Sequence, residues 1–234
     1  MTDPLLAIDD VSVSYDGGET FAVRRATLDL PAGAFVALVG ASGSGKTSLL
    51  KCINRLSEPT AGDIRFEGRS NHALPAPALR RSIGYVFQGI GLFPHMSVAE
   101  NIAITPRLLG WPEGEIATRV NDLLDLVQLP REMASRPSRA LSGGQQQRVG
   151  IARALAAKPK LMVMDEPFGA LDPVTRDGLG TAYRKLHDDL GLTTIMVTHD
   201  IQEAVLLSDR IVVMEKGRII ADDTPRAMMR MTGN

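Results

Sequence analysis

Residues 35–48 run Phe35-Val-Ala-Leu-Val-Gly-Ala-Ser-Gly-Ser-Gly-Lys-Thr-Ser48 and set the architecture of this 234-residue chain. The run 35–39 is apolar, has strand length and shows no polar alternation, as expected of a strand buried on both faces of a parallel sheet. Glycines follow at once, and apolar residues at helical spacing begin after Lys46. The order of strand, glycine loop and helix predicts an α/β fold.

The glycine loop fits the phosphate-binding spacing G-x-x-x-x-G-K-[ST]. Gly40, Gly43 and Gly45 lack a Cβ atom, so successive backbone N–H groups can curl around an anion. Lys46 offers a positive charge to the β and γ phosphates of a nucleotide, and Thr47 offers a hydroxyl to Mg²⁺. One unit charge pair at ~4 Å is worth roughly 4 kcal/mol at an effective dielectric of ~20. We predict a nucleotide site here; the alternative is a plain glycine- and serine-rich turn.

Composition points to an ordinary soluble protein, with 44% hydrophobic and 23% charged residues. Lys and Arg number 26 against 27 Asp and Glu, so no basic excess indicates a nucleic-acid partner. Cys52 is the only cysteine, which excludes an internal disulfide; we interpret it as a packing residue, with a reactive thiol as the alternative. Neither a secretory signal nor a run long enough to span a bilayer is present, so a cytoplasmic location is expected.

Short alternating segments predict an antiparallel β region over residues 5–30, with a turn at 16–18. Tyr15 is expected to end one of these strands, either as a half-buried strand residue or as a ring that stacks on an adenine base. Residues 63–68 predict a further strand, and residues 73–78 predict a loop because they contain prolines.

Three further predicted strands end in polar residues with possible chemical roles. Asp165 could hold Mg²⁺, and Glu166 could act as the general base toward a water at the γ-phosphate. Gln88 could offer its amide to Mg²⁺ or to that water, and His199 could contact the γ-phosphate. Each has a plain alternative as a solvated or structural residue. These strands are predicted over 83–87, 161–166 and 193–197.

Between residues 89 and 139 strand-like runs disappear, and apolar residues recur at helical spacing from Ile116 to Val127. We predict a helical subdomain over about 89–157, inserted in the core. Trp111 lies in a break between its helices, as a packing residue or as part of a contact surface.

A second possible anion site follows at Leu141–Gln145. Ser142 and Gln145 fit a capping box, so the segment starts a helix, and its two glycines expose backbone amides there. A mere helix cap is the alternative for this segment taken alone.

In their order along nearly the whole chain, the motifs resemble those of ABC transporter ATPase subunits. The motifs are Gly40–Thr47, Gln88, Leu141–Gln145, Leu161–Glu166, Ala170-Leu171-Asp172 and His199. The resemblance implies one P-loop NTPase domain over residues 1–234, with a RecA-like core, an antiparallel β subdomain and the helical insertion. It also implies a head-to-tail homodimer, in which the glycine loop of one copy faces the Ser142 helix of the other.

The resemblance also implies a role for each site residue. Tyr15 stacks on adenine, Gln88 senses the membrane partner, and Asp172 organises the dimer. The implied contacts with ATP are Tyr15, Gly40, Ser42, Gly43, Ser44, Gly45, Lys46, Thr47, Ser48, Ser142, Gly143, Gly144, Gln145 and Asp172. The implied Mg²⁺ ligands are Thr47, Gln88 and Asp165, and the implied catalytic residues are Glu166, His199, Lys46 and Gln88.

The stretch 89–102, with 54–56 and 108–111, looks most like the importers of glycine betaine, choline and related osmoprotectants. That resemblance implies an ATPase at the cytoplasmic face of the plasma membrane, partnered by permease subunits and indirectly by an extracytoplasmic solute-binding protein. The regulatory CBS modules of many such subunits are not expected in a chain that ends at Asn234. Alternatives are an importer of polar amino acids and a non-transport ABC ATPase. A P-loop kinase or GTPase would leave Leu141–Gln145 and His199 unexplained.

Overall fold

The computed structural model of the protein describes residues 3–89 and 91–231. Outside them lie residues 1, 2, 90 and 232–234, among them Ile90 of the stretch that resembles the osmoprotectant importers. The chain divides into two compact units. Residues 1–80 together with 191–234 are called unit 1, and residues 81–190 are called unit 2.

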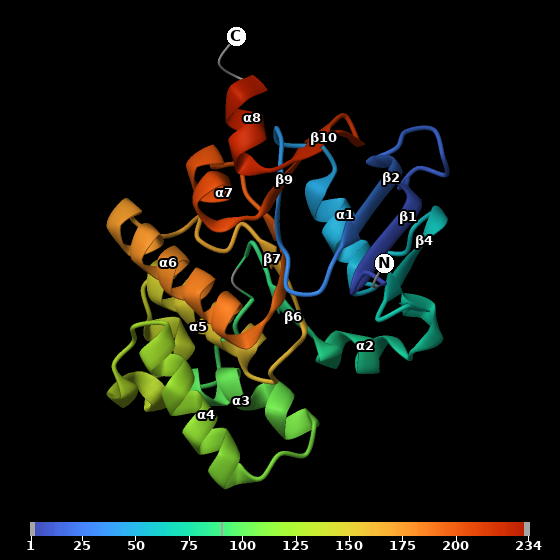
Figure 1. Cartoon of the computed structure of the whole chain (residues 1–234). Coiled ribbons are helices and arrows are strands. Elements are labelled where there is room, and N and C mark those ends of the chain that lie inside the picture. The colour runs from blue at the N-terminus through green and yellow to red at the C-terminus, as the bar shows by residue number, and fades with distance from the viewer. Residues whose placement is uncertain (1–2, 90, 232–234) are drawn as a thin grey trace. The chain divides into compact units, whose positions relative to one another are not determined.

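Unit 1 combines an antiparallel and a largely parallel arrangement of strands. The antiparallel sheet has the order β2-β1-β4-β5, and Figure 1 shows β1, β2 and β4 side by side. In the other arrangement β3 pairs in parallel with both β8 and β9, and β10 pairs antiparallel with β9. The strands are β1 Leu6–Val13, β2 Val23–Leu30, β3 Phe35–Val39, β4 Ala61–Phe66, β5 Arg69–Ser70, β8 Thr193–Val197, β9 Arg210–Glu215 and β10 Arg218–Asp223.

Strand β3 lies between β8 and β9 in its sheet, and every one of its residues is buried, as the unbroken apolar run predicts. Asp209 fixes where the strand begins. Its carboxylate accepts a hydrogen bond from the Phe35 amide at 2.8 Å, and its own amide donates to the Phe35 carbonyl at 2.8 Å. The helices of unit 1 are α1 Lys46–Ile53, η1 Asn71–Ala73, α2 Ala76–Ser82, which ends just beyond the unit, α7 Ile201–Leu207 and α8 Pro225–Met231.

Unit 2 contains two parallel strands and a group of helices. β6 pairs in parallel with β7, with Val86 opposite Met164. The predicted apolar stripe from Ile116 to Val127 is buried, as an amphipathic helix requires. The elements are β6 Ile83–Val86, α3 Val98–Leu108, α4 Glu113–Leu126, η2 Arg131–Ser135, η3 Ser138–Ala140, α5 Gly143–Leu155, β7 Leu161–Asp165 and α6 Pro173–Leu190.

Three local predictions differ from the structure. The predicted loop 73–78 is wrong, because helix α2 begins at Ala76. Pro77 lies in its first turn, where a proline removes no intrahelical hydrogen bond. β1 ends at Val13, so Tyr15 lies two residues beyond the strand it was expected to end. β6 ends at Val86, so Phe87 also lies outside its strand.

Candidate functional site

The glycine loop in unit 1 is folded around the Lys46 ammonium. This group donates hydrogen bonds to the carbonyl oxygens of Gly40 at 2.8 Å and Ala41 at 2.9 Å, and to the Ser44 hydroxyl at 3.2 Å. Only 7% of Lys46 is exposed. A positive charge is therefore held inside a loop whose shape is already set.

Two glycines of this loop touch neighbouring backbone. A Cβ on Gly45, which has φ +104°, would lie within 3.0 Å of the Ala22 carbonyl oxygen. A Cβ on Gly40 would crowd the Met214 carbonyl oxygen in the same way. The Gly217 amide, in the turn between β9 and β10, donates to the Ser44 carbonyl at 3.0 Å. The loop is thus supported from outside by backbone contacts that leave no room for side chains.

Helix α1 begins inside the loop and presents its positive end there. Gly45 is the N-cap and supplies no side-chain cap, and the first turn holds no acidic residue. The amides of that turn are therefore aimed at the loop without a competing carboxylate, which is the arrangement that binds phosphate at helix N-termini. Thr47 and Ser48 lie half-buried in this turn.

Tyr15 lies in the connection between β1 and β2, and 66% of it is exposed. The half-buried strand alternative is therefore wrong, and the ring is accessible for stacking. The connection is ordered by Asp16, whose carboxylate accepts hydrogen bonds from the Thr20 amide at 2.9 Å and the Ser14 hydroxyl at 2.7 Å. The hydrogen bonds from Thr20, followed by that from Ser14, hold the pKa of Asp16 well below its usual range.

His199 lies at the same sheet edge as the glycine loop. β8 and β3 are parallel, Val197 is opposite Leu38, and the Thr198 amide donates to the Leu38 carbonyl at 3.3 Å. The carboxyl ends of both strands therefore meet, and His199 is exposed there.

Unit 2 brings Gln88, Asp165 and Glu166 to one edge in the same way, because β6 and β7 are parallel. Gln88 is exposed, whereas only 3% of Asp165 is exposed. Burial and, secondly, the negative charge of Asp165 raise the pKa of Tyr85 on β6. A buried carboxylate at the end of a strand is thus joined by the half-buried Glu166.

The N-terminus of α5 forms the predicted capping box. The Ser142 hydroxyl accepts a hydrogen bond from the Gln145 amide at 3.3 Å, and the Gln145 side chain accepts from the Ser142 amide at 3.0 Å. Ser142 and Gly143 are exposed. Asp172 accepts from the Thr175 amide at 3.0 Å, and its hydrogen bonding to Thr175 holds its pKa below the usual value. The first turns of α5 and α6 are therefore both capped.

The structure reveals one residue that the sequence analysis missed. Gln147 is 2% exposed, and its side-chain amide bonds to the backbone of both Glu166 and Ala170. The available signal was a glutamine on the apolar face of a helix, which needs partners when buried. The sequence did not reveal which backbone groups those partners are.

The predicted site residues thus fall into two groups, each assembled within its own unit. Unit 1 holds Tyr15, Gly40, Ser42, Gly43, Ser44, Gly45, Lys46, Thr47, Ser48 and His199. Unit 2 holds Gln88, Ser142, Gly143, Gly144, Gln145, Asp165, Glu166 and Asp172.

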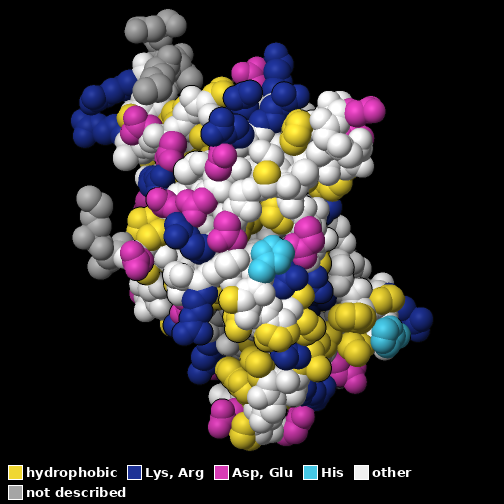
Figure 2. Space-filling view, turned by 90° about the vertical axis from the view of Figure 1, so that its right-hand side faces the viewer, with side chains coloured by type: hydrophobic (Ala, Val, Ile, Leu, Met, Phe, Trp, Pro, Cys, Tyr) yellow, Lys and Arg dark blue, Asp and Glu magenta, His cyan; other side chains and the backbone are white. Residues whose placement is uncertain are grey.

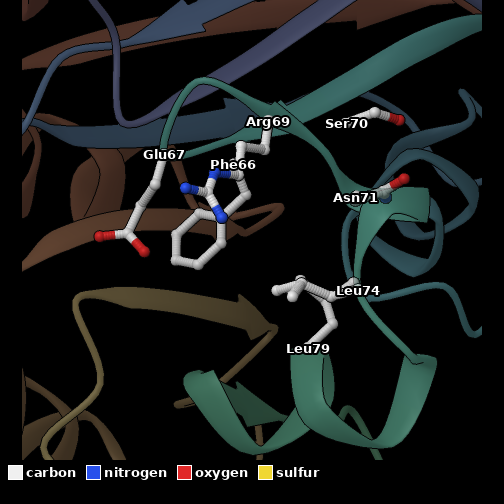
Figure 3. Close-up of a pocket in the computed structure, with 7 residues that line it drawn as sticks. All are labelled: Phe66, Glu67, Arg69, Ser70, Asn71, Leu74 and Leu79. Carbon is white, nitrogen blue, oxygen red and sulfur yellow. The ribbon is translucent and has the colours of Figure 1, made fainter.

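Two surface hollows lie apart from these residues. One, of about 360 Å³, is lined by Phe66, Glu67, Arg69, Ser70, Asn71, Leu74 and Leu79, and Figure 3 shows Leu74 and Leu79 turned toward the Phe66 ring. The other is in unit 2, where the Lys158 ammonium lies 5.5 Å from the centre of the Trp111 ring. Trp111 therefore packs against a charged side chain at the surface.

Across residues 3–89 and 91–231, we find no helix with the length and apolar character needed to cross a bilayer. Within the same residues, His, Cys, Asp and Glu side chains form no group of three or more that could hold a metal by themselves.

Comparisons with known proteins agree with this geometry. Residues 23–169 match the family model described as ABC transporter. The carnitine transport ATP-binding protein OpuCA of Listeria monocytogenes is 49% identical over 98% of this chain, which covers 58% of that relative. The glycine betaine/carnitine/choline transport ATP-binding protein OpuCA of Bacillus subtilis is 47% identical over 98% of the chain and 60% of the relative.

The chain therefore spans about 60% of the length of these curated relatives. Among solved structures, the ATP-binding cassette MJ0796 in a dimeric post-hydrolysis state with ADP and Pi superposes with a TM-score of 0.87. It is 32% identical and covers 94% of this chain and 99% of that one. The predicted P-loop NTPase fold and the predicted likeness to osmoprotectant importers are both confirmed. The chain belongs to the ABC transporter family.

Proposed function

We propose that this chain binds ATP together with Mg²⁺ and hydrolyses the ATP to power a membrane importer. One observation carries the proposal: the Lys46 ammonium sits inside a preformed glycine loop, at the positive end of α1. Such a loop offers backbone amides, a buried cation and a helix dipole to one polyanion. The likeness to an ATP-binding cassette supports the choice of nucleotide.

Each remaining group has a role in hydrolysis. Glu166 orients and polarises the attacking water, and Lys46 and His199 stabilise the charge that develops on the transferred phosphoryl group. Thr47, Gln88 and Asp165 offer the oxygen ligands that Mg²⁺ prefers, and the ion would neutralise phosphate charge when bound. The exposed ring of Tyr15 stacks on the adenine base.

We further propose that two copies act together, which would explain why one chain carries two anion sites. The capped and exposed start of α5, from Ser142 to Gln145, would bind the γ-phosphate held by the partner copy. Asp172 would help to align the two copies. α3, α4 and α5 would belong to the helical subdomain predicted over about 89–157. The dimeric state of MJ0796 supports this arrangement.

The importer would be one for osmoprotectants such as glycine betaine or choline, as the names of the relatives suggest. Permease subunits would hold the chain at the cytoplasmic face of the plasma membrane, and a solute-binding protein would act indirectly. Figure 2 shows hydrophobic side chains gathered at the lower end of one face, at the height of α3 and α4 in Figure 1. Exposed apolar residues of unit 2, including Phe93, Leu108 and Leu109, are candidate permease contacts.

The hydrolysis step is tested with the Glu166→Gln variant. We expect the wild-type chain to release phosphate from ATP and Mg²⁺. We expect Glu166→Gln to bind ATP, to keep only a small residual rate of hydrolysis and to become dimeric by light scattering. Glu132→Gln, which changes an exposed carboxylate on η2, is the matched control and should hydrolyse normally. Full turnover by Glu166→Gln would remove Glu166 from the role, and a strictly monomeric Glu166→Gln protein in saturating ATP would refute the dimer.

The transported solute is tested in cells that lack this chain. Growth in high salt should be rescued by added glycine betaine or choline only when the chain is restored. Rescue that does not depend on the chain would contradict the osmoprotectant assignment, while leaving ATP hydrolysis in place.

A further inference from the structure

We infer that Gln147 is a positioning residue, which holds the backbone of Glu166 and joins it to the N-terminal half of α5. The inference rests on the proposed function, because it takes Glu166 as the residue that polarises the attacking water. Gln147 would therefore act through Glu166 and not by direct contact with the nucleotide.

Both ends of the Gln147 amide are used. Its Nε2 donates to the Glu166 carbonyl oxygen at 3.0 Å, and its Oε1 accepts from the Ala170 amide at 2.9 Å. The side chain is 2% exposed, so water does not readily replace either bond. Among side chains of this length, only a carboxamide has the donor and the acceptor that this loop requires.

The loop needs this support because Glu166 has an unfavourable backbone conformation. Its φ is +47°, in the left-handed region that residues with a side chain rarely occupy. Such a conformation persists where the surrounding contacts fix it. The Glu166 carbonyl receives two donors, Gln147 and the Gly169 amide at 3.2 Å, which together set the direction of its peptide.

The direction of the peptide matters for the carboxylate. The Glu166 side chain turns back toward Gly169, where an added Cβ would lie 3.8 Å from Oε2. Rotation of the backbone at Glu166 would therefore swing the carboxylate away from its present place. A displacement of about 1 Å at a reacting group can cost on the order of 10²-fold in rate.

The start of α5 rests on the same loop. A Cβ on Gly144 would lie 3.1 Å from Cδ2 of Leu171 and 3.8 Å from the Ala170 carbonyl oxygen. Gly144 and Gln147 lie three residues apart on α5, so they face the loop together. A shift of the α5 N-terminus would thus be passed to Glu166 by packing at Gly144 and by hydrogen bonds at Gln147.

The experiment combines Gln147→Met, which keeps the side-chain length, and Gln147→Leu with the Glu166→Gln background. In the wild-type background we expect kcat to fall 10- to 100-fold, with KM for ATP and the affinity for a non-hydrolysable ATP analogue changed less than about threefold. In the Glu166→Gln background the same substitutions should not lower the residual rate further, because a positioning residue has nothing left to position.

Gln146→Met is the matched control, since Gln146 is the neighbouring glutamine and donates to the Leu141 carbonyl at 3.1 Å. It should leave kcat within about twofold. An unchanged kcat for both Gln147 variants would overturn the inference, as would an equal loss in both backgrounds. Unfolding of both variants, or a joint loss of analogue affinity and kcat, would show a merely structural role and would also overturn it.

The two proposals fail in different ways. If the unaltered chain does not hydrolyse ATP, or Glu166→Gln hydrolyses it fully, the proposed function fails and the inference fails with it. If both behave as proposed while the Gln147 variants turn over normally, the inference alone fails.

Discussion

Replacing Gly45 by alanine tests whether the glycine loop is held by backbone contacts rather than by its own flexibility. Gly43 provides a control in the same loop, because it also has a positive φ, +77°, yet an added Cβ would meet nothing within 4 Å. At Gly45 the added Cβ would meet the Ala22 carbonyl oxygen within 3.0 Å. The two substitutions share the conformational penalty and differ in the clash.

The magnitudes follow from these two terms. A left-handed backbone costs a residue with a side chain roughly 1–2 kcal/mol, which is the whole loss expected for Gly43→Ala. Overpacking costs roughly 1–3 kcal/mol in general. At Gly45 we expect the upper half of this range, because the Ala22 carbonyl that the added Cβ meets belongs to the backbone and cannot rotate away as a side chain can. We therefore expect Gly45→Ala to lower the free energy of unfolding by about 3–5 kcal/mol.

The measurement is urea denaturation of both variants and the wild-type chain, followed by fluorescence and circular dichroism in parallel. The midpoint for Gly45→Ala should lie well below that for Gly43→Ala, without a change in the denaturant slope. Equal losses for the two variants would refute the reasoning, because they would show that the loop moves away from Ala22 at no cost.

Three further predictions concern separate parts of the chain. Lys46→Met should weaken ATP binding by about 10²- to 10³-fold, because losing one charge pair costs at most roughly 4 kcal/mol. Titration calorimetry measures the affinity, and an unchanged affinity would contradict the role of Lys46. Gly84→Ala should lower the free energy of unfolding by about 2–3 kcal/mol, because the added Cβ would clash with the Ala154 carbonyl oxygen and with Pro159. Urea denaturation measures this loss, and a variant as stable as the wild type would show that β6 can shift to make room. Burial, aided by the nearby charge of Glu58, raises the pKa of Cys52 to about 11, so iodoacetamide at pH 8 should label only urea-unfolded protein. Since the unfolded thiol ionises first, the contribution of Cys52 to stability should be intact below pH 9 and lost as the pH rises through about 11; Cys52→Ala should remove that change.

Elements buried on both faces were the easiest to predict from sequence. The runs 35–39 and 193–197 match β3 and β8 at both ends, because a strand buried along its whole length reads as an unbroken run of apolar and β-branched residues. The capping box at Ser142 was also visible, since its side chains and the amides they bond lie within one turn. Local chemistry was enough in both cases.

Features were missed where the local signal is ambiguous or where the partner lies elsewhere in the chain. Ala76 begins a helix although prolines surround it, because a proline in the first turn is compatible with a helix as well as with a loop. The role of Gln147 depends on the path of residues 166–170, a turn that no spacing along α5 encodes. The alternation of apolar and polar residues continues to Tyr15, whereas strand β1 ends at Val13, so the pattern predicts a strand that is too long.

Helix α5 has an exposed start and a buried side, and under the proposed function the two would have different tasks. Its exposed N-terminus, around Ser142 and Gly143, is suited to an anion from outside the chain, whereas its buried side reaches the backbone of Glu166 through Gln147. A change at Ser142 that leaves α5 in place should therefore weaken ATP-driven dimerisation without moving Glu166. A change at Gln147 should do the reverse, because the dimer would still close around a carboxylate that is wrongly aimed.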